Sequence, residues 1–137
     1  MRADVELLIN IDVPDVDKAI AFYTSALGLK VGRRFARDGV ELLGANAPIY
    51  LLKKPAGSTP TPGAARRDYE RHWTPVHLDI VVPDLDAALQ RARQAGATLE
   101  QPVQDRSWGR LANLADPFGH GLCILQFSER GYDAIAE

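Results

Sequence analysis

The N-terminal part of this 137-residue chain has a second copy 69 positions further on, measured from Asp15 to Asp84. The aligned identities include Ile11 and Ile80, Val13 and Val82, Pro14 and Pro83, Asp15 and Asp84, Asp17 and Asp86, and Ala19 and Ala88. Both copies have an alternating apolar segment, a Pro-Asp stop, a segment with helical apolar spacing and a glycine. A repeat in one register indicates two copies of one structural unit.

The alternation in residues 5–13 predicts a strand with two unlike faces. One face is apolar and is expected to pack on a helix: Val5, Leu7, Ile9, Ile11 and Val13. The other is mostly polar and is expected to face water or a polar cavity: Glu6, Leu8, Asn10 and Asp12. In the second copy, residues 76–82 repeat the pattern and place His77, Asp79 and Val81 on the polar face.

Each predicted strand is followed by a predicted helix. Asp15 and Asp84 are N-cap residues by type and position, and Gly28 and Gly96 end the apolar spacing. The expected buried stripes are Val16, Ala19, Ile20, Tyr23 and Leu27 in one helix, and Leu85, Ala88, Leu89, Ala92 and Ala95 in the other. Further strands are expected at residues 30–36, 40–44, 49–52, 99–104, 110–115 and 121–127.

The predicted fold class is therefore α+β, with two tandem βαβββ modules that form a curved mixed-sheet cup and carry their helices on the outer face. We expect one domain made of a first module at 1–53, a linker or flap at 54–74, a second module at 75–128 and a tail at 129–137. The segment 54–74 begins rich in Pro and Gly and ends with residues that predict a short helical turn.

Composition excludes several function classes. A formal net charge of −2 gives no basic surface for nucleic acid. The longest apolar runs are too short to cross a membrane, and the N-terminus lacks an export signal. The single cysteine, Cys123, cannot form an internal disulfide, so we expect a cytoplasmic location.

Three segments carry a resemblance to a known family: IDVPDVDKAIAFYTSALGLKV at 11–31, VHLDIVVPDLDAALQRARQAGA at 76–97 and WGRLANLADPFGHGLCILQF at 108–127. Together they resemble the vicinal oxygen chelate superfamily, which includes glyoxalases, bleomycin resistance proteins and extradiol dioxygenases. The resemblance implies paired βαβββ modules, a small-molecule ligand and a homodimer. It does not imply one reaction, because members include lyases, epimerases, dioxygenases, thiol transferases and non-catalytic drug binders.

The resemblance also implies four positions for metal ligands, which fall on Leu8, Tyr50, His77 and Cys123. Leu8 cannot bind a metal, and Cys123 stands where the family usually has Glu, so the usual metal site reads as degenerate. His77 is the one normal ligand that remains. The thiol of Cys123 can bind zinc if it is ionised, although a buried inert thiol is the alternative.

Strand alternation supplies the other candidates. His77, Glu6 and Asp79 are candidate catalytic residues, since a histidine beside a carboxylate can transfer protons. Candidate ligand-binding residues are Leu8, Asn10, Tyr50, Trp108, Arg110 and Cys123. Trp73 and Trp108 with Arg110 suit a planar or anionic ligand, and the alternative is that they cover core edges and solvent.

Three functions follow from these residues. The first is a metal-free protein that binds a small organic molecule in the sheet cavity. The second is a lyase, isomerase or dioxygenase that uses a divalent metal (Zn, Fe, Mn or Ni) held by His77 and non-standard ligands. The third is a metal-independent acid–base enzyme that uses His77 with Glu6 or Asp79.

Overall fold

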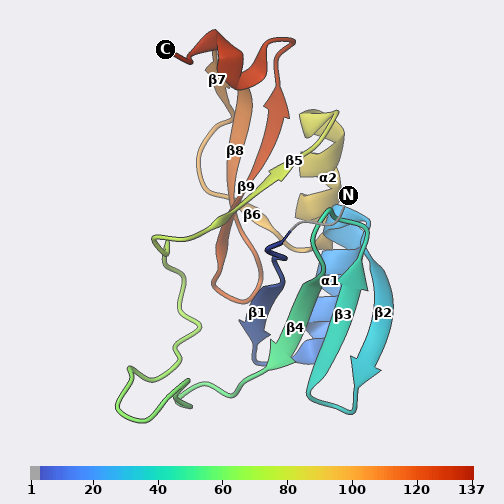
Figure 1. The fold of residues 1–137 in the computed structure, drawn as a ribbon, viewed down its shortest axis with the longest axis vertical. Coiled ribbons are helices and arrows are strands. Elements are labelled where there is room, and N and C mark those ends of the chain that lie inside the picture. The colour runs from blue at the N-terminus through green and yellow to red at the C-terminus, as the bar shows by residue number, and fades with distance from the viewer. Residues whose placement is uncertain (1–3) are drawn as a thin grey trace. The chain divides into compact units, whose positions relative to one another are not determined.

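The computed structural model describes residues 4–137 and divides into two compact units. The first unit is Met1–Tyr69 and the second unit is Glu70–Glu137. Each unit contains one α-helix and one mixed sheet, and these helices and strands can be followed in Figure 1. The fold is therefore α+β, as predicted.

The first unit is a βαβββ module with the elements β1 (Ile9–Val13), α1 (Val16–Leu27), β2 (Lys30–Phe35), β3 (Gly39–Leu43) and β4 (Ile49–Lys53). Its sheet has the strand order β1-β4-β3-β2, with β1 parallel to β4 and the other neighbours antiparallel. Helix α1 packs against β2, β3 and β4. One face of the sheet is thus covered by the unit's own helix.

The second unit repeats this topology with β5 (Leu78–Val81), α2 (Leu85–Ala95), β6 (Thr98–Leu99), β7 (Gln104–Arg106), β8 (Gly109–Ala115), β9 (Gly121–Phe127) and the 3₁₀ helix η1 (Gly131–Ala134). Its sheet order is β5-β9-β8-β6, and β7 also pairs with β8. The short strands β6 and β7 therefore replace a single edge strand. Pro102 lies in the break between them, where a ladder hydrogen bond would need an N–H that proline lacks.

Both helices begin as the sequence predicts. Asp15 Oδ1 accepts a hydrogen bond from the backbone N–H of Lys18 at 3.0 Å, and Asp84 Oδ1 accepts one from Ala87 at 3.1 Å. Gly28 follows α1 with a φ of 69°, a conformation that costs glycine little. The repeated Asp therefore satisfies an orphan N–H of the first turn in each unit.

The buried faces of the helices differ in part from the prediction. In α1 the fully buried residues are Ala19, Phe22, Tyr23 and Ala26, and in α2 they are Leu85, Ala88 and Ala92. Phe22 and Ala26 replace the predicted Val16, Ile20 and Leu27, which are only half-buried. The buried face of α1 is thus the one that carries both Phe22 and Tyr23.

The two strands that open the units are shorter than predicted. β1 starts at Ile9, opposite Ile49, the first residue of β4. Residues 5–8 therefore have no strand beside them, and Val5 and Leu7 are exposed. β5 likewise starts at Leu78, opposite Leu122 near the start of β9, so Val76 lies outside the ladder. In both units the apolar alternation in the sequence therefore starts several residues before the strand finds a partner in the sheet.

The predicted helical turn near 64–73 is wrong, because residues 54–77, all of which the structure describes, contain no helix. A loop closes instead: Gly57 N–H bonds to Arg67 O at 2.8 Å and Arg67 N–H to Ser58 O at 2.7 Å. Arg67 Nε also pairs with Asp12 Oδ2 of β1 at 2.9 Å. These contacts hold the loop within the first unit.

Each core lies between a helix and its own sheet. Fully buried strand residues include Val13, Val40, Leu42, Ile49 and Leu51 in the first unit, and Ala112, Leu114, Leu122 and Ile124 in the second. In the second unit, Cys123 and Leu125 are also buried, and strand alternation places them on the face of β9 opposite to Leu122 and Ile124. Neither helix within residues 4–137 has the length and apolar character that a membrane crossing requires.

Candidate functional site

The second sheet has one face toward α2 and one open face, and strand alternation assigns its residues. Leu85 N–H donates to Gln126 Oε1, and Arg110 pairs with Asp86, so residues 126 and 110 lie on the helix side. Alternate residues then point to the open face. Cys123 of β9 and Asn113 of β8 belong to this open face.

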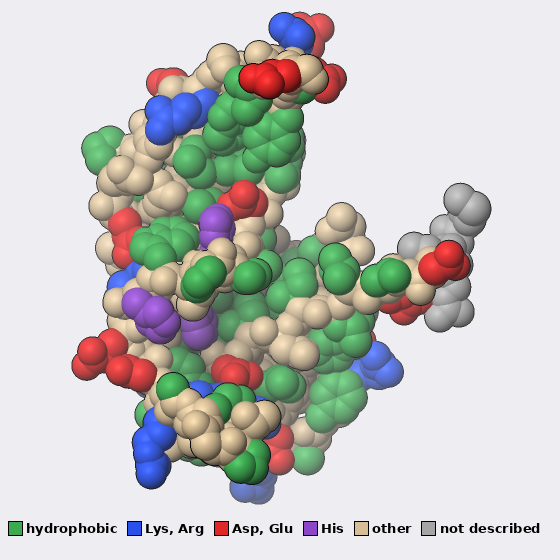
Figure 2. Space-filling model, turned by 60° about the vertical axis from the view of Figure 1, so that its left-hand side comes forward, with side chains coloured by type: hydrophobic (Ala, Val, Ile, Leu, Met, Phe, Trp, Pro, Cys, Tyr) green, Lys and Arg blue, Asp and Glu red, His purple; other side chains and the backbone are tan. Residues whose placement is uncertain are grey.

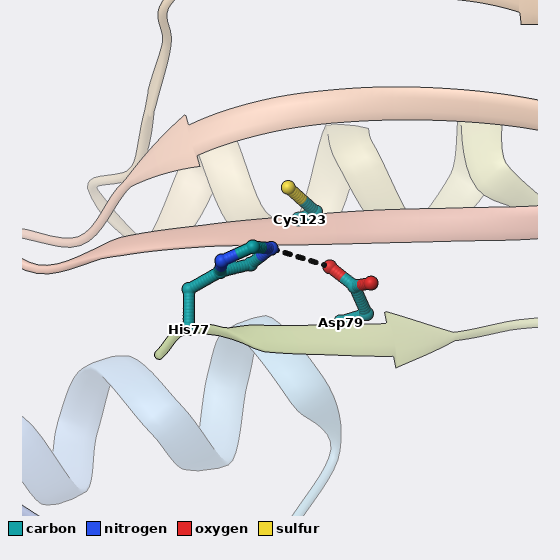
Figure 3. A group of neighbouring side chains, drawn as sticks. All are labelled: His77, Asp79 and Cys123. Carbon is teal, nitrogen blue, oxygen red and sulfur yellow. Dashed lines mark ion pairs between the residues drawn. The ribbon is translucent and has the colours of Figure 1, made fainter. Parts of the chain in front are cut away.

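A polar row crosses the open face. The strand register places Asp79 of β5 opposite Cys123 of β9, and Cys123 opposite Asn113 of β8. His77 precedes Asp79 by two residues and lies on the same side. The donor atoms of His77, Asp79 and Cys123 all lie within 4.8 Å of one another (Figure 3). The structure thus brings together three of the sequence-predicted residues.

Hydrogen bonds connect this row. His77 Nε2 lies 3.2 Å from Asp79 Oδ1, and both side chains are more than a third exposed. Asn113 Nδ2 donates to Cys123 Sγ at 3.2 Å. The Asn113 carbonyl oxygen accepts from Gln104 Nε2 at 3.0 Å and Gln101 Nε2 at 2.5 Å. These two donors fix the amide of Asn113 with its N–H₂ toward the sulfur.

Burial and the neighbouring charge of Asp79 raise the pKa of the Cys123 thiol to about 11, despite the hydrogen bond from Asn113. The thiol is therefore neutral near pH 7. Because the thiolate is the nucleophilic form, Cys123 is not an activated nucleophile in the protein alone.

A second cluster adjoins His77. Arg71 binds Glu100 through two nitrogens at 2.6 Å each, and Trp73 Nε1 donates to the same carboxylate at 2.9 Å. The Arg71 guanidinium lies 4.6 Å from the Trp73 ring centroid. Arg71 holds the pKa of Glu100 below its usual range, chiefly through these hydrogen bonds. The indole is therefore a fixed group, and its ring lies 5.7 Å from the His77 ring, edge to face.

Gly121 makes room for this cluster. A Cβ atom built there would lie 2.6 Å from both Arg71 Nη2 and Trp73 Cε3. Trp73 remains 42% exposed. Figure 2 shows histidine side chains at the surface among apolar and acidic ones. The second unit thus presents an aromatic ring, an imidazole and a carboxylate side by side.

The equivalent row in the first unit has different chemistry. The register places Asn10 opposite Tyr50, and Tyr50 opposite Glu41. Tyr50 OH donates to Glu41 Oε2 at 2.9 Å, and Arg33 Nη2 lies 2.7 Å from the same oxygen. Hydrogen bonds from Arg33 hold the pKa of Glu41 at about 2. Tyr50 is thus engaged by Glu41 and Arg33 rather than left as an isolated donor.

Glu6 and Leu8 both precede β1 and are exposed, so the strand alternation that grouped them with Asn10 does not extend to them. That grouping is wrong, because the ladder begins at Ile9. Leu8 is the counterpart of His77 by the repeat and offers no ligand atom. The structure describes each unit by itself, so a hollow that both units line stays a prediction.

Trp108 and Arg110 do not join the polar row. Trp108 packs against Phe127 and Tyr132, with ring centroids 6.2 and 5.4 Å away. Arg110 pairs with Asp86 of α2 at 3.1 Å and with Asp105 at 3.3 Å. Arg110 thus lies on the face of β8 that is turned toward α2, and its predicted ligand-binding role stays a prediction.

Sequence reasoning missed Asn113, Gln101, Gln104, Arg71 and Glu100. Alternation within residues 110–115 could have placed Asn113 on the open face, but its position opposite Cys123 depends on the turn between β8 and β9. Asp116 Oδ1 fixes that turn by accepting from Phe118 N–H at 2.8 Å and His120 N–H at 2.9 Å.

A hollow of about 560 Å³ lies elsewhere, beside the start of α1 in the first unit. Its charged lining residues are Asp15, Asp17, Arg34, Arg37 and Lys53. None of the sequence-predicted site residues lines it. The polar row of the second unit remains the candidate site.

Comparison with known proteins decides the family. Residues 8–125 match the family model described as glyoxalase-like domain. The chain belongs to the glyoxalase-like domain family. The resemblance to the vicinal oxygen chelate superfamily is thereby confirmed.

Individual relatives agree with this family. The uncharacterised protein Mb0911c of Mycobacterium bovis is 35% identical over 79% of this chain and 74% of its own length. The anthracycline biosynthesis protein DnrV of Streptomyces peucetius is 31% identical over 84% of this chain, which spans only 38% of DnrV. The crystal structure of a glyoxalase-related enzyme from Fulvimarina pelagi shares the fold, with a TM-score of 0.71 at 17% identity over 90% of this chain and 88% of that one.

Two sets of residues in this glyoxalase-like domain can be tested for their fit to a divalent metal. The four positions that the resemblance implies do not fit, because Leu8 has no donor atom. His77, Asp79 and Cys123 offer a nitrogen, an oxygen and a sulfur within 4.8 Å. Imidazole, carboxylate and thiolate are the ligand types that bind zinc.

Proposed function

We propose that this protein binds a small organic molecule on the open face of the second unit, against Trp73, His77 and Asp79. The observation that carries the proposal is the exposed Trp73–His77 pair beside a hydrogen-bonded polar row. Trp73 is 42% exposed, although hydrogen bonds and stacking hold its ring in place. A fixed aromatic surface with a few polar groups is typical of small-molecule sites.

The geometry supports a flat ligand that carries hydroxyl or carbonyl oxygens. The indole offers a stacking surface, while the His77–Asp79 pair offers a donor and an acceptor to such oxygens. DnrV is named for anthracycline biosynthesis, and anthracyclines are fused-ring compounds with phenol and quinone oxygens. An anthracycline is therefore a suitable probe for this site.

Tryptophan fluorescence tests the proposal, because the chain has two tryptophans. In a Trp108→Phe background Trp73 is the sole reporter. Titration of an anthracycline into this metal-free variant should quench the fluorescence to saturation, after correction for absorption by the probe. His77→Ala should weaken binding about tenfold, which corresponds to about 1.4 kcal/mol.

His72→Ala is the matched control, because His72 is exposed and its ring bonds to the backbone carbonyl of Glu70. It should leave the affinity unchanged. Quenching that does not saturate, or equal affinity in the His77→Ala protein, would contradict the proposal.

A second candidate function is a divalent-metal-dependent lyase, isomerase or dioxygenase, favoured by the convergence of His77, Asp79 and Cys123. A bound metal would polarise adjacent oxygens of a substrate. In that case His77 and Asp79 would hold the metal together with Cys123. Stoichiometric zinc, iron, manganese or nickel in protein purified without chelators, lost on His77→Ala, would favour this candidate. Activity that depends on His77 but resists chelators would favour a metal-independent acid–base enzyme.

We also propose a cytoplasmic homodimer. The lone cysteine suits a reducing compartment. Exposed apolar side chains on the N-terminal segment, including Val5 and Leu7, suit a covering partner.

A further inference from the structure

We propose that the second unit binds Zn²⁺ through His77, Asp79 and the thiolate of Cys123, with Asn113 as the positioning residue for the sulfur. The inference deepens the second candidate function and does not depend on the binding of an organic ligand. The set of positions that the resemblance implies draws on both units and lacks Asp79, whereas all three ligands proposed here come from one unit and include Asp79.

The backbone already brings the donor atoms together. Asp79 and Cys123 are direct cross-strand neighbours, and His77 is two residues before Asp79. Zinc bond lengths of about 2.0–2.3 Å in a tetrahedron place donor atoms about 3.3–3.8 Å apart. The present donors lie within 4.8 Å, with His77 and Asp79 at 3.2 Å. These two side chains are more than a third exposed and can rotate toward the buried sulfur.

The donor types select the metal. Thiolate and imidazole favour zinc, whereas magnesium and calcium require oxygen ligands. Three protein ligands leave a fourth position on a zinc ion open, as in catalytic zinc sites. The exposed sides of His77 and Asp79 place that position toward solvent, where an oxygen of a small molecule can reach it.

Asn113 fits the role of a positioning residue. Its amide donates to Cys123 Sγ at 3.2 Å, and Gln101 and Gln104 hold its oxygen on the other side. The amide therefore cannot turn its oxygen toward the sulfur without losing two hydrogen bonds. An N–H donor stabilises negative charge on a metal-bound sulfur, and outer groups of this kind contribute about 10–100-fold to metal affinity.

Cobalt substitution tests the ligand set in the full-length chain. Because Cys123 is the only cysteine, a thiolate-to-cobalt charge-transfer band can arise only from Cys123. Metal-stripped protein titrated with Co²⁺ should show this band at one equivalent, and Zn²⁺ should abolish it. Cys123→Ser should remove the band, and His77→Ala should weaken binding at least about tenfold. His72→Ala, the matched control, should bind as the wild type does.

Asn113→Ala tests the positioning role. We expect a shift in the energy of the charge-transfer band and a loss of about 10–100-fold in Zn²⁺ affinity, measured by competition with a chromophoric chelator. A purely structural role for Asn113 would not shift the band. Circular dichroism and thermal unfolding establish that each variant is folded.

One measurement needs no variant: at an alkaline pH at which the metal-free wild-type protein is alkylated at Cys123, Zn²⁺ should slow that alkylation. Co²⁺ binding without a charge-transfer band, or alkylation at the same rate with and without Zn²⁺, would overturn the proposal. The anthracycline titration uses metal-free protein, so failure of ligand binding and failure of zinc binding are separate results.

Discussion

Glu41 is a buried carboxylate whose negative charge is compensated by the guanidinium of Arg33. Arg33 reaches it with its backbone N–H and two guanidinium nitrogens, and Tyr50 adds its hydroxyl. Hydrogen bonds from Arg33 are the largest cause of the lowered pKa of about 2. The carboxyl therefore binds a proton less readily in the folded than in the unfolded chain.

This difference predicts a pH dependence of stability. The unfolded chain takes up a proton at Glu41 near its ordinary pKa of about 4.3, so the stabilisation is complete above that pH and is lost as the pH falls toward about 2. Glu41→Gln should lower the urea midpoint at pH 7, and its difference from the wild type should shrink between pH 5 and pH 2. Glu129→Gln, a change of an exposed carboxylate, serves as control and should show no such trend. A constant difference across this range would show that the charge of Glu41 is not responsible.

At the scale of elements, the repeated Asp residues make a second prediction. Asp84→Ala removes the hydrogen bond to the Ala87 N–H at the start of α2 and should destabilise the protein by about 1 kcal/mol. Asp84→Asn keeps a capping oxygen and should cost much less. Urea unfolding at pH 7 measures both variants. Equal losses for Ala and Asn would mean that the charge of Asp84, rather than its capping bond, matters.

Helices were predictable here because their signals are local. The Pro-Asp starts and the glycine after each helix lie within a few residues of the elements they delimit. Strand starts were less predictable, because β1 and β5 begin where their parallel partners β4 and β9 begin, which the local sequence does not show. The apolar alternation of residues 5–8 continues past that limit, which is why Glu6 and Leu8 were placed wrongly on a strand face.

The candidate site was predictable only in part for the same reason. His77, Asp79 and Cys123 follow from parity and from the resemblance. The contacts of Asn113 depend on the β8–β9 register, and those of Arg71 and Glu100 join residues 29 positions apart. Arg110 lies on the face of β8 turned toward α2, where it pairs with Asp86, and the sequence alone does not show this pairing.

At the scale of the whole molecule, exposed apolar side chains bear on the proposed homodimer. Val5, Leu7 and Val76 are 75%, 73% and 85% exposed within the described chain. Apolar groups so exposed favour a partner surface. Light scattering after gel filtration should give about twice the chain mass of 15.0 kDa at micromolar concentration. A mass that stays at that of one chain over the whole concentration range would contradict the dimer.

The two polar rows occupy equivalent positions in the sheets of the two units, but their side chains differ in how readily they can be substituted. In the first unit, Arg33 and Tyr50 both bond to the Glu41 carboxylate, so replacement of either one leaves a buried charge with fewer partners. In the second unit, His77 and Asp79 meet solvent and can be exchanged at smaller cost to folding. Evolution of new specificity in this architecture should therefore concentrate in the C-terminal half, while the N-terminal half preserves the scaffold.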